Sequence, residues 1–149
     1  MSVIKEGLLA AMLNLLHERI ESAQAAIDSA IESRDTATKS SAGDKHETGR
    51  ALMQIEIDNQ KKQLANSLLL KNTLSQIPLS KSSKVDFGSL VQTNHGFFFI
   101  SISLGTVEFS GLEYFTISPA TPPALALTGA TIGNAIHFQG RTYQVLNIS

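Results

Sequence analysis

Two carboxylates, Asp44 and Glu47, stand three residues apart inside the short polar segment 39–47. Two acids on one helical turn can hold a divalent cation together and orient its water. The same spacing also begins helices, with Asp44 as the N-cap and Glu47 reaching back from the third helical position. The residues alone leave both interpretations open. Because Mg²⁺ takes six oxygen ligands, a partner would have to complete any metal site here.

Other reactive groups in the chain form no comparable pattern. There is no cysteine, which removes disulfides, thiolate catalysis and zinc–thiolate sites. The four histidines show no metal-ligand spacing, and His46, between the two acids, is interpreted as a solvated side chain. Ser40 and Ser41 have no histidine and acid arranged to activate them. We therefore expect no enzyme acting by itself.

Charge and hydropathy narrow the class of partner. The net charge is −1, with nine Lys/Arg against ten Asp/Glu in residues 1–77 and three against three in 78–149. No basic patch is visible, so we expect no independent DNA binding, and any nucleic-acid role should run through a protein partner. No apolar run approaches the ~18 residues that span a bilayer, so we expect no membrane contact and a cytoplasmic location.

Two long helical patterns flank the acidic segment. Val3 to about Arg34 contains no proline, and its apolar residues alternate at spacings of four and three, as in a coiled-coil seam. The seam consists of Leu9, Leu13, Leu16, Ile20, Ala23, Ile27 and Ala30. A second helix is predicted from Asp44 to about Gln76, ended by Pro78. Residues 1–77 should thus form an antiparallel helical hairpin with its tip at about 39–47.

Beyond the hairpin the pattern changes from helical to extended. Residues 78–84 are polar and serine-rich and indicate a linker. Residues 85–149 should form a small, mostly antiparallel sheet with one short helix that begins at prolines near Pro122. The predicted strands are 89–93, 97–103, 106–109, 112–118, 136–139 and 142–148. The fold class is therefore α+β.

This order of elements, a long hairpin with an acidic tip, a linker and a small sheet domain, resembles the Gre family of bacterial transcript-cleavage factors. The resemblance covers essentially the whole chain. Residues 43–47 are similar to the family's Gly-Asp-x-x-Glu tip motif. Residues 117–122, followed by 126–129 and 132–134, are similar to its Ile-Ser-Pro-x-Ser-Pro, Ala-Leu-x-Gly and Gly-Asp run. The resemblance implies an FKBP-like C-terminal domain used for docking. The docking residues that it implies are Ser118, Pro119, Pro122, Leu127 and Gly129.

The resemblance also implies a mechanism. The partner would be RNA polymerase, whose secondary channel would receive the hairpin. Asp44 and Glu47 would hold Mg²⁺ jointly with the polymerase's own acids, and the 3′ end of a backtracked transcript would be cut there, so that contact with RNA is indirect.

Two alternatives remain. Residues 48–51 read Thr-Gly-Arg-Ala, where family members usually have a further acid and an aromatic, and Asn134 replaces an acid. A non-catalytic regulator that binds the same channel would need neither carboxylate. A coiled-coil adaptor unrelated to polymerase would use the leucine-rich start of the first helix to dimerise.

Overall fold

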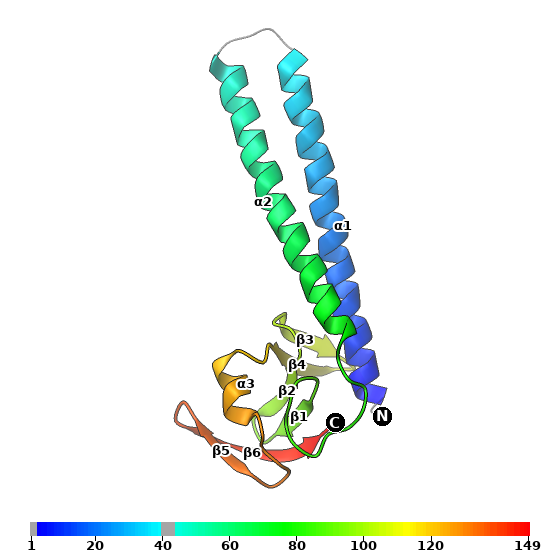
Figure 1. Ribbon diagram of the computed structural model, residues 1–149, viewed down its shortest axis with the longest axis vertical. Coiled ribbons are helices and arrows are strands. Elements are labelled where there is room, and N and C mark those ends of the chain that lie inside the picture. The colour runs from blue at the N-terminus through cyan, green and yellow to red at the C-terminus, as the bar shows by residue number, and fades with distance from the viewer. Residues whose placement is uncertain (1–2, 40–43) are drawn as a thin grey trace. The chain divides into compact units, whose positions relative to one another are not determined.

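A computed structural model describes residues 3–39 and 44–149, with side chains for 3–36 and 47–149. The expected architecture is confirmed: a long N-terminal helical hairpin precedes a six-stranded, mostly antiparallel sheet with one short helix (Figure 1). The helices are α1 (Val3–Lys39), α2 (Asp44–Ser75) and α3 (Pro122–Leu127). The strands are β1 (Leu90–Thr93), β2 (Gly96–Ile100), β3 (Gly105–Phe109), β4 (Leu112–Ile117), β5 (Ala135–Phe138) and β6 (Arg141–Ile148).

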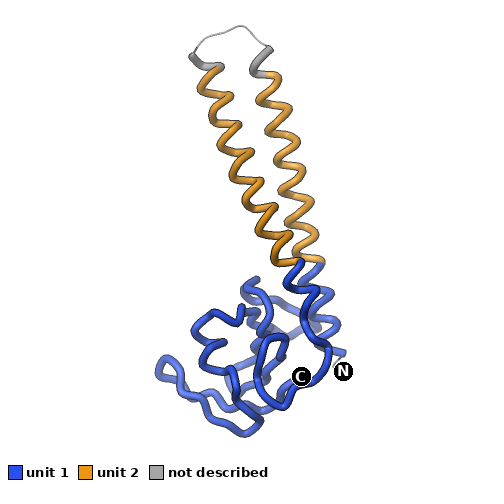
Figure 2. The backbone as a smooth tube through the Cα atoms, in the orientation of Figure 1, with its two compact units in different colours: residues 1–13, 72–149 blue, residues 14–71 orange. Residues whose placement is uncertain are grey.

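The chain divides into two compact units, which Figure 2 distinguishes by colour. Unit 1 comprises residues 1–13 and 72–149, and unit 2 comprises 14–71. The boundary passes through both long helices, so the first turns of α1 and the last turn of α2 belong to the same unit as the sheet. No described helix has an apolar stretch that meets the requirements for crossing a bilayer.

Unit 2 contains an antiparallel pair of helices that bury one narrow seam. Leu16, Ala23, Ile27 and Ala30 of α1 are almost fully buried, as the predicted seam requires. On α2, Ile57 is 1% exposed and Ser67 is 5% exposed. Because each helix has one neighbour in this unit, most other positions are exposed, including Leu52, Ile55 and Leu69.

Helix α1 continues further than its composition suggests. The residues after Ser33 have weak helical propensity, yet α1 extends to Lys39. Arg34 supplies a physical reason, because its side chain bonds across to α2 and so ties this turn to its neighbour. Intrinsic propensity differs by only ~0.7 kcal/mol among ordinary residues, and a contact of this kind outweighs it.

The sheet of unit 1 has the order β3-β4-β2-β1-β6-β5. All neighbouring pairs are antiparallel except β2 and β4, which are parallel. The β5–β6 hairpin turns through Gln139 and Gly140, whose φ values are +48° and +76°. Positive φ at both central residues is the requirement of a two-residue type I′ turn, which matches the twist of the strands that it joins.

One face of the sheet packs with α3 into a single apolar core. The cluster comprises Val85, Val91, Ile100, Ala124, Leu127, Ala130, Val145 and Ile148. Val85 also forms two backbone hydrogen bonds with the segment after α3, from its N–H to Ala130 and from Gly129 to its carbonyl. The chain entering the sheet and the end of α3 are thus held side by side.

Gly7 leaves room for the ring of Phe109 to lie close against α1. A Cβ built on Gly7 would overlap the ring of Phe109 in β3, whereas a Cβ on Gly49 of α2 would meet nothing within 4 Å. Glycine inside a helix costs ~1 kcal/mol relative to alanine. The two helical glycines therefore have opposite physical settings, one required by packing and the other not.

We expect Gly7→Ala to destabilise the protein by about 1–3 kcal/mol through overpacking. Gly49→Ala should stabilise it by about 0.5–1 kcal/mol, because alanine is the better helix former. Urea unfolding followed by circular dichroism measures both. Adding Phe109→Leu to Gly7→Ala should recover part of the loss. Equal effects of the two glycine substitutions would contradict the packing explanation.

Lys5 lies in the first turns of α1, and only 1% of its surface is exposed. Burial lowers the pKa of its amine below the ordinary value of 10.5, because desolvation disfavours the ammonium. Between the lowered pKa and 10.5, the unfolded chain therefore binds more protons than the folded chain. In that window the free energy of unfolding rises with pH.

Comparison with Lys5→Met tests this linkage. The difference in unfolding free energy between the native protein and the variant should move in favour of the native protein as the pH rises toward 10.5. Denaturant titrations of both proteins at several alkaline pH values, with Lys84→Met as the exposed control, provide the measurement. A difference that does not change with pH would show that the burial of Lys5 does not shift its pKa.

Candidate functional site

The two tip carboxylates fall at the beginning of α2, which starts at Asp44. The side chain of Asp44 lies outside the described residues, as does that of His46. Glu47 is exposed and stands one turn further along. Residues three apart lie on neighbouring positions of a helix surface, and acids in a first turn interact favourably with the helix dipole. The predicted beginning of the helix at Asp44 is confirmed, whereas the capping and the metal-holding roles of the two carboxylates stay predictions.

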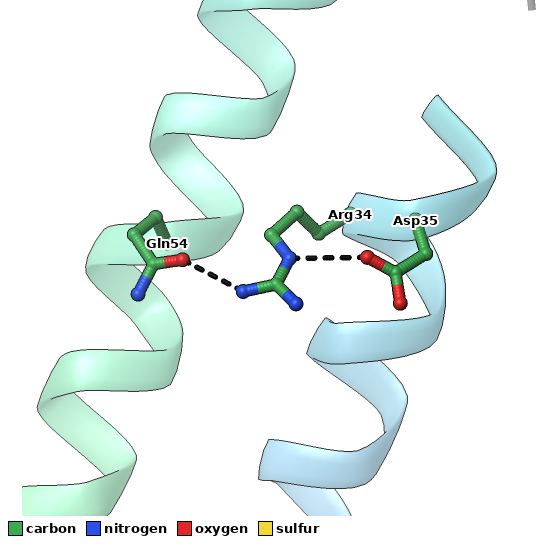
Figure 3. A network of polar contacts seen from close by, with 3 residues as sticks. All are labelled: Arg34, Asp35 and Gln54. Carbon is green, nitrogen blue, oxygen red and sulfur yellow. Dashed lines mark hydrogen bonds and ion pairs between the residues drawn. The ribbon is translucent and has the colours of Figure 1, made fainter. Parts of the chain in front are cut away.

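A polar contact between the helices lies below the tip and is drawn in Figure 3. The Arg34 guanidinium donates to Oε1 of Gln54 at 2.8 Å, across from α1 to α2. Gln54 in turn donates from Nε2 to Asp58 at 3.1 Å. Arg34 also pairs with the neighbouring Asp35 at 3.2 Å. This network fixes the position of α2 along α1 close to the tip.

The hydrogen-bonded network lies in line with the apolar seam of α1 and adds polar side chains to its end. Arg34 follows Ala30 by four residues, which is the seam's own spacing, and it is only 25% exposed. Gln54 follows Met53, which is partly buried. A hydrogen bond between two such side chains has a direction, so it specifies register more narrowly than contacts between alanines do.

Sequence reasoning missed Arg34 and Gln54. The available signal was the seam spacing, which places an arginine after Ala30 where an apolar residue was due. The same reasoning also missed the significance of Gly7, since only the folded chain places Phe109 beside it.

The donor set suits a hard cation but does not complete its coordination. Carboxylate oxygens are the ligands that Mg²⁺ prefers, and two acids provide fewer than the six oxygens it needs. Among the side chains that the structure describes, those of residues 3–36 and 47–149, no three of His, Cys, Asp or Glu gather into a metal site. Asp44 and Glu47 could therefore contribute to a metal site that a partner completes.

The predicted docking residues occupy one segment around α3. The Ser118 carbonyl accepts from the backbone and hydroxyl of Thr121, which forms the turn into the helix. Pro119 and Pro122 are exposed. Leu127 is 3% exposed and packs in the core, and Gly129 has a φ of +86° that favours glycine. Serine, leucine and glycine thus have structural roles, while the two prolines are accessible to a partner.

A small apolar cavity adjoins this segment. Its lining comes from α3, β5, β2 and β6, and comprises Phe98, Pro123, Ala126, Leu127, Ile136, Phe138 and Tyr143. Its empty volume is about 190 Å³, including its mouth. The space that a water-sized sphere can enter is only about 10 Å³, which is room for about one water molecule. Only Leu127 belongs to both the cavity and the predicted docking residues.

Comparisons with known proteins give limited matches. No family model matches the chain, and no curated protein matches it. Among solved structures, the GreA factor homolog 1 (Gfh1) protein of Thermus thermophilus is 17% identical, with a TM-score of 0.36, and covers 95% of this chain and 92% of its own. A second structure, described as the transcription factor Gfh1, is 17% identical with a TM-score of 0.31, covering 99% and 95%. At these values neither likeness identifies the function.

We expect Gln54→Ala to lower the free energy of unfolding by about 1 kcal/mol, because it removes a hydrogen bond to a charged, partly buried group. Asp35→Ala should change it by less than about 0.5 kcal/mol, since exposed ion pairs contribute little. Asp35 is 55% exposed and serves as the matched control on the same arginine. Thermal and urea unfolding of both variants measure these changes. A larger loss of unfolding free energy in Asp35→Ala than in Gln54→Ala would show that the ion pair, and not the bond between the helices, is the stabilising contact of Arg34.

Proposed function

We propose that this protein is an accessory transcription factor that acts on RNA polymerase from its secondary channel. Its helical hairpin carries Asp44 and Glu47 to the polymerase active site. There the two carboxylates complete, with the polymerase's own acids, the ligands of a Mg²⁺ ion and so stimulate cleavage of backtracked transcripts. The ion, when bound, polarises a water for attack on the phosphodiester.

The observation that carries the proposal is the placement of the acid pair. Both residues belong to the first turn of α2, immediately after the segment that joins the two helices. They come at the end of a helix pair whose seam is narrow and whose polar network lies within three turns of them. Such a support places the two residues on one turn of a narrow helix pair, which suits an active site reached through a channel.

The residues of this chain have distinct tasks in the proposed mechanism. Glu47 is exposed, so its carboxylate is available to a shared ligand without removing a partner in the described part of the chain. Arg34 and Gln54 are positioning residues, since they hold α2 against α1 and touch no reacting atom. Because the net charge of the chain is −1, recognition of the transcript's 3′ end is left to the polymerase.

The test is cleavage of end-labelled RNA in a stalled, backtracked elongation complex from the same organism, with Mg²⁺. Asp44→Asn/Glu47→Gln should reduce the stimulated rate by at least ~100-fold, because removing a preorganised charge at a reacting centre typically has an effect of this size. Binding to polymerase, measured by co-sedimentation, should remain. The control is Asp28→Asn/Glu32→Gln, which removes two exposed acids from α1.

Each other outcome has a definite meaning. Binding without stimulated cleavage in the native protein would favour the non-catalytic regulator, for which the departure at residues 48–51 is the supporting observation. Loss of binding in the tip variant would assign the acids to docking. No binding at all would favour the coiled-coil adaptor.

A further inference from the structure

Helices α1 and α2 border an open groove midway along unit 2. Its lining comes from residues 15–23 of α1 and residues 60–67 of α2, so the whole groove lies within this unit. The space that a water-sized sphere can enter is about 450 Å³. The groove is open because Ala23 and Ser67, which lie in the seam, fill less of the space between the helices than larger side chains would.

Polar groups in this groove have no partner within the described part of the chain. Ser67 is only 5% exposed, and its hydroxyl, which no described residue hydrogen-bonds, opens on the groove. Glu18 and Arg19 line the groove and are exposed, and neither forms an ion pair with another described residue. A polar surface that fills the groove would therefore find a hydroxyl, a carboxylate and a guanidinium available to bind it.

The sizes of the lining side chains alternate between the two ends of the groove. Because the helices are antiparallel, Leu15 and Ser67 lie at one end, and Ala23 and Gln60 lie at the other. Each helix thus contributes one large and one small side chain. A second copy, turned by 180° about an axis across the helices, would place Leu15 of one copy opposite Ala23 of the other. The same rotation would place Gln60 of one copy opposite Ser67 of the other.

The charges at the middle of the lining select this antiparallel orientation. Glu18 and Arg19 are neighbours of opposite sign, and the rotation brings each one next to its opposite in the other copy. It also brings Gln63, at the middle of the α2 lining, opposite itself, and two carboxamides can each donate and accept. In a parallel pair, α1 would face α2 of the other copy, and both charges would meet the uncharged Gln63.

We infer that two copies of this chain pair through the groove as an antiparallel, two-fold symmetric assembly of four helices. Glu18 pairs with Arg19 of the other copy. The Ser67 hydroxyl donates to Oε1 of Gln60 of the other copy, whose Nε2 is already bonded to Glu56. An isologous interface requires a surface that is complementary to itself, and this lining is so in size, charge and hydrogen bonding.

The pairing has a consequence for the proposed function. It covers the two helices that this function places inside the polymerase, so the paired form and the polymerase-bound form exclude each other. This consequence alone rests on the proposed function. The pairing itself is measured without polymerase, so it can fail or succeed independently of transcript cleavage.

The first test is sedimentation velocity of the full chain at concentrations from about 0.02 to 1 mM. Because the lining is mostly polar, we expect a weak, reversible dimer with a dissociation constant of about 0.05–0.5 mM. Glu18→Arg and Arg19→Glu, each alone, should weaken the self-association at least tenfold, because like charges then meet across the axis. An equimolar mixture of these two variants should associate again, since one copy then supplies both cations and the other both anions.

Two controls accompany these variants. The double variant Glu18→Arg/Arg19→Glu exchanges the two charges and should associate as the native chain does. Glu32→Arg reverses an exposed acid of α1 outside the groove lining and should have no effect on the association. Circular dichroism should show the same helix content in every variant, because all of these side chains are exposed.

The second test identifies which residues meet. The chain has no cysteine, so a single introduced cysteine reports a symmetric contact without interference. Gln63→Cys should form a disulfide between copies under mild oxidation, because the pairing places this residue opposite itself. Asn59→Cys is the control, since residue 59 is also exposed and lies about one turn away. The same pairing separates its two copies by about 12 Å along the helices, which is too far for a disulfide.

Three results would overturn the inference. The first is a monomer at every concentration of the native chain. The second is self-association that the single charge reversals leave unchanged, or that their mixture does not restore, which would place any dimer contact outside the groove or in another orientation. The third is a disulfide that forms as readily in Asn59→Cys as in Gln63→Cys, which would show random collisions and no fixed pairing.

Discussion

A pair of helices can bury only one stripe of each partner, and this constraint governs unit 2. The stripe on α1 holds two alanines, so it provides little apolar area. On α2, Gln60 and Ser67 take seam positions where leucine would bury more apolar area. An open groove lies beside them, lined in part by Glu18, Arg19 and Gln63. Directional hydrogen bonds must then contribute the stability and the register that apolar burial does not provide. The bond from Arg34 to Gln54 is one of them.

The same constraint explains why the elements could be predicted and why their fine positioning could not. Apolar residues at alternating spacings of four and three, as from Leu16 to Ala30, fall on one face only if the segment is an α-helix. Both the helix and its buried face could therefore be predicted from the sequence. The strands followed from β-rich runs separated by glycine turns, with bounds correct to within three residues. The register between α1 and α2 depends on which polar side chains meet, and a one-dimensional pattern does not contain that information.

The candidate sites show a similar division. The beginning of α2 at Asp44 was predictable because glycine and an acid interrupt two helical patterns there. The cavity beside α3 was not, since Phe98 and Tyr143 come from strands 45 residues apart in the chain and converge only after the sheet is assembled. The contact of Gly7 could not be predicted either. A glycine in a helix indicates that another part of the chain packs closely there, but the sequence does not show which part.

The position of β6 between β1 and the edge strand β5 has a consequence for synthesis. This strand lies between β1 and β5, and its Ile148 pairs with Val91. The strands β3-β4-β2-β1 pair without β6, and a ribosome releases all four of them before Ile148 emerges, so the β5–β6 hairpin joins the sheet last. Until then the edge of β1 that β6 covers has no strand partner in the nascent chain. Chaperones that bind exposed strand edges would find a target there during that interval.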